Sequence, residues 1–336
     1  MSATESGSGV RCAACGEPLV AGDRFCEGCG APVATDGSGV PERSADARPC
    51  AECAAPPSEI AADGYCQRCG RKQPDPRDHL EEVAGAIAGV TDKGVSHWRN
   101  EDAMAFSTAG DGFVIVVCDG VSSTQNPQQA SQAAVDAALA ILVAAAAATP
   151  GGAPDAIVQA AAAANRAAVA VPYDPDAKAG PPSCTFVAAV LVGETLTVGW
   201  VGDSRAYWLD EAGGRQLTRD DSWATQQVAA GAMSETEAFA DPRAHAITRW
   251  LGADAEEVTP QVVEAVVDAP GLVLVCSDGL WNYAATVGEL VAVVGDIDVA
   301  SEDPAALTRR LCAFAIAAGG HDNITVVAAP VRPGER

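Results

Sequence analysis

The strongest constraint in this 336-residue sequence is a repeated pattern in which an apolar strand ends in an aspartate and a glycine. Residues 271–281 read GLVLVCSDGLW, and the apolar run leads to Asp278. Residues 113–120 read FVIVVCDG and lead in the same way to Asp119. Apolar runs of this length, rich in β-branched residues and closed by glycine, predict buried strands that each deliver one carboxylate into a turn.

Acidic residues at the ends of several apolar strands are expected to converge at one edge of a sheet. Further carboxylates occur before, between and after the two strands, at Glu101, Asp102, Asp203 and Asp322. A cluster of ionised carboxylates without matching lysines is stable only when cations neutralise it. Because hard divalent ions prefer oxygen ligands, the pattern predicts a pair of Mg²⁺ or Mn²⁺ ions.

Short motifs occur in a fixed order along residues 91–327. They are Gly94…Asn100-Glu101-Asp102, Asp119-Gly120, Ser183-Cys184-Thr185, Gly202-Asp203-Ser204-Arg205, Leu217-Thr218-Arg219-Asp220-Asp221-Ser222, Ile247-Thr248-Arg249-Trp250-Leu251-Gly252, Asp278-Gly279 and Asp322-Asn323-Ile324-Thr325. Each motif is weak alone. Together, in this order and spacing, they resemble the bacterial type of the PPM family, the metal-dependent serine/threonine phosphatases also called protein phosphatase 2C.

The resemblance implies an α+β fold, a four-layer αββα sandwich of two antiparallel sheets flanked by helices. We expect this domain at residues 82–330, followed by a tail at 331–336. The resemblance also implies hydrolysis of protein phosphoserine and phosphothreonine by attack of a metal-bridging hydroxide. The expected partners are therefore phosphoproteins, the products of serine/threonine kinases.

The resemblance assigns roles to the acidic motifs. The implied metal ligands are the carboxylates of Glu101, Asp119, Asp278 and Asp322 and the backbone carbonyl of Gly120. In this assignment Asp119 bridges both ions, and Asp102 orients metal-bound water.

Three positions depart from the family pattern. An arginine that often binds phosphate, four residues before the metal-binding glutamate, is replaced by His97. A protonated imidazole also binds phosphate, and we expect Arg99 to assist it. A histidine that follows Asp-Gly in some members is replaced by Val121, so no general acid is assigned. Many bacterial relatives bind a third ion between two aspartates. Here these positions are Asp203 and Asn282, and since an amide contributes no charge, a third ion is expected to bind weakly or not at all.

Eight of the twelve cysteines lie before residue 70, as four CxxC pairs. The pairs are Cys12 and Cys15, Cys26 and Cys29, Cys50 and Cys53, and Cys66 and Cys69. This spacing lets two thiolates bind one ion from a tight turn, so residues 11–72 are predicted to form a double zinc ribbon with two structural Zn²⁺ ions. Disulfides or a redox CxxC are the alternatives, and a cytoplasmic location disfavours the disulfides.

Composition limits the remaining possibilities. The formal net charge of −24 argues against nucleic acid as a partner, so a protein partner is expected for the ribbon. The first ten residues read as a disordered lead without the features of a secretory signal, and residues 73–81 read as a linker. No convincing membrane span occurs, because the alanine-rich stretch at 133–148 is only weakly apolar. We expect a cytoplasmic protein.

Regular elements are expected between the motifs. Strands are predicted at residues 83–90, 184–192, 195–201 and 324–328, and helices at 128–148, 154–171, 287–294 and 303–318. Ser234 begins a capping box, which predicts a short helix inside the irregular stretch 218–251. By resemblance, this stretch is a mobile flap beside the active site. An extended chain at 97–101 would turn His97, Arg99 and Glu101 to one side.

The leading hypothesis is a metal-dependent protein serine/threonine phosphatase. A phosphoprotein-binding pseudophosphatase and a zinc-ribbon adaptor remain as alternatives without catalysis. Retention of every expected carboxylate argues against the first alternative, and the acidic composition argues against an adaptor that binds nucleic acid.

Overall fold

The computed structural model describes residues 49–61, 64–148, 153–295 and 303–333. The chain divides into two compact units, residues 1–73 and 74–336. The cysteine pairs predicted at Cys12 and Cys15 and at Cys26 and Cys29 lie outside the described residues.

The described part of the first unit is built from two tight turns that each carry a CxxC pair. The backbone N–H of Ala54 donates to the carbonyl of Cys50 at 2.9 Å, and that of Gly70 donates to the carbonyl of Cys66 at 2.8 Å. Both donors have a positive φ, +55° for Ala54 and +71° for Gly70. Glycine tolerates this backbone conformation, whereas alanine pays roughly 1–2 kcal/mol for it, so the first turn is the more strained.

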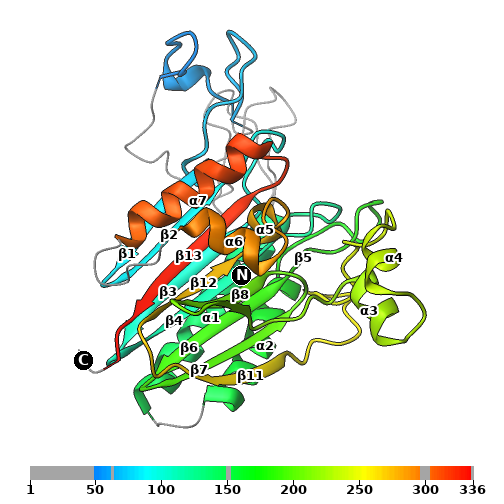
Figure 1. Ribbon diagram of the computed structural model, residues 1–336. Coiled ribbons are helices and arrows are strands. Elements are labelled where there is room, and N and C mark those ends of the chain that lie inside the picture. Colours follow the sequence, from blue (N-terminus) through cyan, green and yellow to red (C-terminus); the bar gives the residue numbers. More distant parts are fainter. Residues whose placement is uncertain (1–48, 62–63, 149–152, 296–302, 334–336) are drawn as a thin grey trace, which may run out of the picture. The chain divides into compact units, whose positions relative to one another are not determined.

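Two antiparallel sheets form the centre of the second unit (Figure 1). The six-stranded sheet has the order β1 (His79–Ala84), β2 (Ile87–Asp92), β13 (Ile324–Val331), β12 (Gly271–Cys276), β8 (Arg205–Asp210) and β9 (Gly213–Gln216). The five-stranded sheet has the order β11 (Gln261–Val266), β7 (Thr195–Val201), β6 (Phe186–Val192), β4 (Gly112–Cys118) and β3 (Ala103–Ala109). A two-stranded pair joins β10 (Leu251–Gly252) to β5 (Ser183–Cys184).

Helices cover the outer face of each large sheet (Figure 1). The helices are α1 (Pro127–Ala148), α2 (Ala153–Val169), α3 (Trp223–Ala229), α4 (Glu235–Phe239), α5 (Asp278–Trp281), α6 (Val287–Val294) and α7 (Pro304–Ala318). α1 and α2 pack on the five-stranded sheet, and α5, α6 and α7 pack on the six-stranded sheet. The predicted four-layer αββα sandwich is therefore confirmed.

Strand β4 shows why the centre of the sandwich is continuous. Val114, Val116 and Cys118 face the layer of α1 and α2. The alternate residues Ile115 and Val117 face the six-stranded sheet, in a core shared by both sheets. Successive side chains of a strand point to opposite faces, so a strand buried on both sides must be apolar throughout. This requirement accounts for the uninterrupted apolar run in the sequence.

Helix α1 is long and apolar enough, by length and composition alone, to cross a membrane. In this fold its buried residues pack into the core between the helices and the five-stranded sheet. They include Ala130, Ala134, Ala138 and Leu142. The spacing of three to four residues places these side chains on one helical face.

Most predicted elements are present, with three local differences. The single strand expected at 83–90 is a hairpin, in which β1 and β2 are joined by a turn at Gly85, whose φ is +62°. β1 begins at His79, inside the stretch expected to be a linker. The strand expected to start at Cys184 is interrupted, because β5 ends at that residue and β6 starts at Phe186.

The stretch expected to be irregular contains α3, α4 and a small core of their own. Ala224, Ala238 and Ala244 form this core with partly buried Trp223, Val228 and other apolar residues. The capping box is confirmed, since Ser234 accepts from the backbone N–H of Glu237 while the Glu237 carboxylate accepts from the backbone N–H of Ser234.

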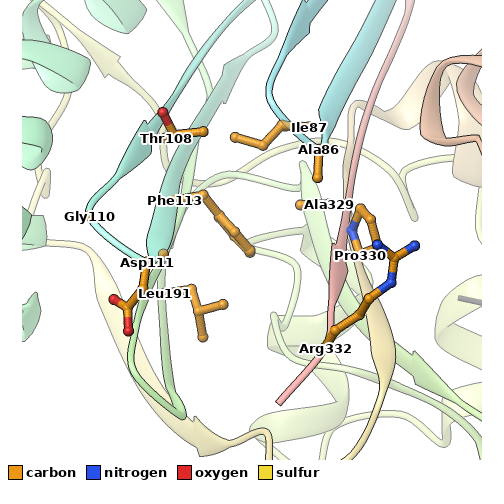
Figure 2. Close-up of a pocket in the computed structure, with 11 residues that line it drawn as sticks. Ala86, Ile87, Thr108, Gly110, Asp111, Phe113, Leu191, Ala329, Pro330 and Arg332 are labelled. Carbon is orange, nitrogen blue, oxygen red and sulfur yellow. The ribbon is translucent and has the colours of Figure 1, made fainter. Parts of the chain in front are cut away.

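A pocket of about 270 Å³ opens at the sheet ends remote from the acidic motifs (Figure 2). Its apolar lining includes Ile87, Phe113, Leu191 and Ala329, which lie at the starts of β2 and β4 and near the ends of β6 and β13. None of the predicted metal-binding carboxylates lines this pocket, and Asp111 provides the one carboxylate among the lining residues. This pocket therefore does not contain the predicted site.

Close packing around Gly279 generates a stability prediction. A Cβ atom at this position would lie 1.9 Å from the backbone oxygen of Asn323. We expect Gly279→Ala to lower the free energy of unfolding by about 2 kcal/mol or more, because the backbone beside Asp278 and Asp322 must shift. Gly288→Ala in α6 is the matched control: nothing lies within 4 Å of its Cβ position, and stability should rise by about 0.5–1 kcal/mol. Chemical denaturation measures both, and equal effects would contradict the prediction.

Candidate metal centre

The predicted carboxylates converge where strands of both sheets end. We define the carboxylate cluster by its members: Glu101, Asp102, Asp119, Asp278 and Asp322. Glu101 and Asp102 precede β3, and Asp119 follows β4, which pairs with β3. Asp278 follows β12, and Asp322 precedes β13, which pairs with β12. Because both pairs are antiparallel, their adjacent ends lie together, and the packing of the two sheets on a shared core brings the four ends into one region.

Asp102 is held from one side by a buried hydroxyl network. Its Oδ2 accepts from Ser277 Oγ at 2.7 Å and from Thr325 Oγ1 at 2.8 Å. Thr325 is also 2.7 Å from Thr91 Oγ1, which accepts from Asn100 Nδ2 at 2.8 Å. These residues belong to four different segments of the chain. Asp102 is only 1% exposed, so the network fixes its orientation.

Glu101 is fixed through both its backbone and its carboxylate. Its N–H donates to Asn323 Oδ1 at 2.8 Å, and its carbonyl accepts from Ser131 Oγ. Carboxylate oxygen Oε1 is 2.9 Å from Arg99 Nε, and Oε2 accepts from Ser122 Oγ at 2.5 Å. Glu101 therefore reaches the cluster as a buried carboxylate that two side chains already contact.

His97 and Arg99 lie in a loop that bends at residues 98 and 99, so the extended chain on which their common direction would depend is not formed. Asn323 Nδ2 donates to the carbonyls of Lys93 and Arg99, at 2.9 and 3.0 Å, and thereby fixes both ends of the loop. His97 Nε2 lies 3.2 Å from Asp322 Oδ1. The two predicted phosphate-binding side chains thus contact different members of the carboxylate cluster.

Burial and mutual repulsion raise the pKa values of aspartates in the cluster. Desolvation first, then repulsion by other carboxylates, raises the pKa of Asp119 well above its usual range. The repelling groups are Asp102, Asp278, Asp322 and Asp203. Desolvation likewise raises the pKa of Asp102 to about 6, although Ser277 and Thr325 act in the opposite direction. The pKa of Asp278 is raised well above its usual range, by desolvation and then by Asp203 and Asp322.

The donor set of the cluster fits divalent cations. Among the described residues, Oδ1 of Asp102 and Oδ1 of Asp278 are buried side-chain oxygens without a hydrogen-bond partner. An unpartnered buried carboxylate oxygen is costly unless a cation or a bound water takes the missing place, as expected for Asp278 and Asp102 respectively. Carboxylate oxygens are the preferred ligands of Mg²⁺ and Mn²⁺. Gly120 is also buried, beside the cluster, and a Cβ there would lie 2.6 Å from the carbonyl oxygen of Glu101.

Asp203 and Asn282 lie next to Asp278. Asn282 Nδ2 donates to Asp278 Oδ2 at 3.1 Å, so the amide contacts the cluster as a donor. Asp203 is buried, and its carbonyl accepts from the indole N–H of Trp281 at 3.0 Å. Desolvation, followed by repulsion from Asp220, raises the pKa of Asp203 to about 7. Weak or absent binding of a third ion at this position stays a prediction.

A cavity of about 690 Å³ lies between the α3–α4 segment and β8. Its lining includes Arg205, Phe239, His245 and Trp281. Arg205 binds both oxygens of Asp220, at 2.9 and 2.7 Å, and its guanidinium lies 3.7 Å from the centre of the Trp281 ring. Since α5 carries both Trp281 and Asp278, the cavity wall is joined directly to the carboxylate cluster.

The four described CxxC cysteines form a separate candidate metal site. The Sγ atoms of Cys50, Cys53, Cys66 and Cys69 all lie within 4.8 Å of one another. A hydrogen bond from the backbone N–H of Cys53 lowers the pKa of Cys50 to about 6, whereas burial and neighbouring thiols raise the pKa values of Cys53 and Cys69. Without metal, one thiolate is therefore favoured over the others. Gln73 Nε2 donates to the Cys50 sulfur at 3.3 Å. Four converging thiols of this kind match a tetrahedral zinc site.

Several residues that hold the cluster could not be assigned from the sequence. Ser122, Ser131 and Ser277 donate to Glu101 or Asp102, and Asn323 holds the neighbouring loop. Two of them lie inside recognised motifs, Ser277 beside Asp278 and Asn323 beside Asp322, but their partners are far away in the chain. Val121 offers no side-chain hydrogen-bonding group, so the absence of a general acid at this position stands.

Comparison with known sequences decides the family. A profile of the protein phosphatase 2C family matches residues 94–311. The chain belongs to the protein phosphatase 2C family. The serine/threonine protein phosphatase PstP of Mycobacterium tuberculosis is 30% identical over 244 residues, which cover 73% of this chain and 44% of that protein. A serine/threonine phosphatase of Listeria monocytogenes is 32% identical over 144 residues, 43% of this chain and 54% of the relative. The chain thus spans about half the length of these relatives.

Solved phosphatase 2C structures have the same fold. The catalytic domain of PstP in complex with two manganese ions is 30% identical, with a TM-score of 0.58, and the match covers 73% of this chain and 98% of that one. The PPM phosphatase MsPP of Mycobacterium smegmatis is 29% identical, with a TM-score of 0.56, over 74% and 99% of the two chains. The residues that the family profile matches, 94–311, lie in the second unit and do not include the cysteine module.

The raised pKa values generate a prediction about pH and metal. In the metal-free chain the folded aspartates keep protons that they would release on unfolding, where their pKa is about 4. Folding stability should therefore fall as pH rises from about 4 through about 7, the window set by Asp102 and Asp203. Mn²⁺ binds the ionised carboxylates, so it should raise the melting temperature more at about pH 8 than at about pH 5.5.

Thermal unfolding of the full chain, with chelator and with saturating Mn²⁺, measures this difference. Asp119→Asn is the control, since it should remove most of the gain due to Mn²⁺ at either pH. A gain that is equal at both pH values would contradict the metal assignment.

Proposed function

We propose that this chain is a Mg²⁺- or Mn²⁺-dependent protein phosphatase that hydrolyses phosphoserine and phosphothreonine. The observation that carries the proposal is the meeting of five carboxylates at adjoining strand ends, with two buried oxygens left without partners. Membership of the protein phosphatase 2C family supports it, as does the PstP structure with two manganese ions. The substrates would be phosphoproteins made by serine/threonine kinases.

The proposed role of each side chain follows from its contacts. Glu101, Asp119, Asp278 and Asp322, with the Gly120 carbonyl, would hold two ions, which supply charge neutralisation and an activated water. Asp102, oriented by Ser277 and Thr325, would position that water as a hydrogen-bond acceptor. Arg99 and His97 would bind the phosphate oxygens.

A catalytically inactive phosphoprotein-binding domain remains the second candidate. No described contact favours it, and the complete carboxylate set argues for turnover. Metal-dependent hydrolysis of p-nitrophenyl phosphate distinguishes the two functions, since a binding domain would release no p-nitrophenol.

We also infer that residues 11–72 form a double zinc ribbon with one ion in each half. The four thiols at residues 50–69 support the second ion. With so small an apolar core, the metal would supply most of the folding free energy. The net charge of −24 favours a protein over a nucleic acid as the partner of this module. A cytoplasmic location, which keeps thiols reduced, would suit the predicted zinc-binding thiolates.

Replacement of a cluster carboxylate should abolish turnover. Asp278→Asn removes one ligand charge, and we expect turnover to fall by about 10³-fold or more, while the fold persists. Asp102→Asn should cost about 10- to 100-fold, because it perturbs the water rather than the ions. Asp268→Asn, at an exposed residue before the remote end of β12, is the control. Initial rates with Mn²⁺ measure all three, and near-normal activity of Asp278→Asn would contradict the site.

Zinc content should report on the cysteine module independently. The full chain is expected to bind two Zn²⁺ ions, and replacement of Cys50 and Cys53 by serine should remove one. Phosphatase activity supported by Mn²⁺ should survive this loss, because the cluster uses none of these thiols. Elemental analysis gives the stoichiometry; a folded first unit without zinc would refute the assignment.

A further inference from the structure

The pair formed by Arg99 and Glu101 joins a partly exposed cation to a buried carboxylate. The Arg99 side chain is 40% exposed, whereas that of Glu101 is 5% exposed. The backbone of both residues is anchored by Asn323, through the Arg99 carbonyl and the Glu101 N–H. Only the guanidinium end of Arg99 therefore has room to change partner, and it can do so without moving the loop.

Glu101 cannot lose Arg99 without a replacement. A carboxylate this deeply buried is strongly destabilised when its positive partner leaves. Ser122 contacts Oε2 and would remain, but a hydroxyl dipole does not neutralise a full charge. Arg99 is consequently free to leave only when another cation approaches Glu101.

The ion pair between Arg99 and Glu101 also opposes the binding of a divalent cation at Glu101. A divalent ion bound to Glu101 would lie within a few ångströms of the guanidinium that contacts Oε1, and two positive charges at this distance repel each other strongly in a partly buried site. Phosphate at the cluster relieves the repulsion, because it offers the guanidinium a bidentate anionic partner.

We propose that Arg99 alternates between Glu101 and the phosphate group of the substrate, and that this exchange links metal binding to phosphate binding. The inference rests on the proposed function. Arg99 then opposes the ion at Glu101 when phosphate is absent and ceases to oppose it when phosphate is bound. Each ligand strengthens the binding of the other through this one side chain, as reciprocal linkage requires.

The linkage is measurable without turnover. Mn²⁺ affinity of the full chain is determined by calorimetry, with and without saturating phenylphosphonate, a non-hydrolysable phosphate analogue. Arg99→Ala should tighten Mn²⁺ binding about fivefold without the analogue and by less than about twofold with it. Simple removal of a positive charge would instead tighten binding by the same factor in both conditions. The proposal is overturned if Arg99→Ala tightens Mn²⁺ binding by the same factor with and without the analogue, or if it does not tighten Mn²⁺ binding without the analogue.

Two control variants complete the design. Arg309→Ala breaks an exposed pair with Glu81, 3.0 Å long, and should leave both affinities unchanged. Ser122→Ala removes the other contact of Glu101 and should change Mn²⁺ affinity equally with and without the analogue, since it leaves the exchange intact. Circular dichroism verifies that each variant is folded.

Failure of the inference is distinguishable from failure of the proposed function. Wild-type protein that neither binds Mn²⁺ at Asp119 nor hydrolyses p-nitrophenyl phosphate would refute the function itself. Protein that does both, with unchanged linkage in Arg99→Ala, would refute only the exchange.

Discussion

Repulsion among buried carboxylates is the constraint on which the rest of this structure depends. Asp119 lies among other aspartates that each raise its pKa, and burial adds to the cost. A folded chain accepts such a cluster only if its backbone is held by other interactions and a cation compensates the charge. The two antiparallel sheets provide the first condition, because paired apolar strands fix the positions at which the acidic residues emerge.

Side chains around the cluster meet the second condition only in part. Hydroxyls of Ser122, Ser277 and Thr325 orient the carboxylates of Glu101 and Asp102 by hydrogen bonds but do not neutralise their charge. Arg99 and His97 contact Glu101 and Asp322 from the solvent side. The site is thus divided into a buried half, which sets orientation, and an exposed half, whose charged partners can exchange. This division connects the packing of the sandwich to the proposed chemistry of phosphate and metal.

The cysteine module solves a comparable problem with different chemistry. Its core within the described residues contains little more than Cys50, Ala55 and Cys66, so apolar burial contributes little to its stability. Tight turns bring four thiols together instead, and one of these turns requires Ala54 to adopt a left-handed conformation. Tight turns place the ligand groups in the first unit and paired strands place them in the second, and in both units an ion would compensate their charge.

The sequence by itself determined most of the main elements and the carboxylates at the strand ends, because apolar runs and capping residues act locally. The four-layer sandwich and the roles of the cluster residues followed from the resemblance of the ordered motifs to the PPM family. The local pattern was not sufficient where a single turn changes the element. The turn at Gly85 makes a hairpin of the region in which one strand, 83–90, was expected. Only the tertiary structure decided which groups surround the cluster. Ser277 and Thr325 reach Asp102 across more than 170 residues of chain, and Asn323 reaches the His97 loop across a similar separation. Such contacts follow from sheet register and strand order, which no local pattern encodes.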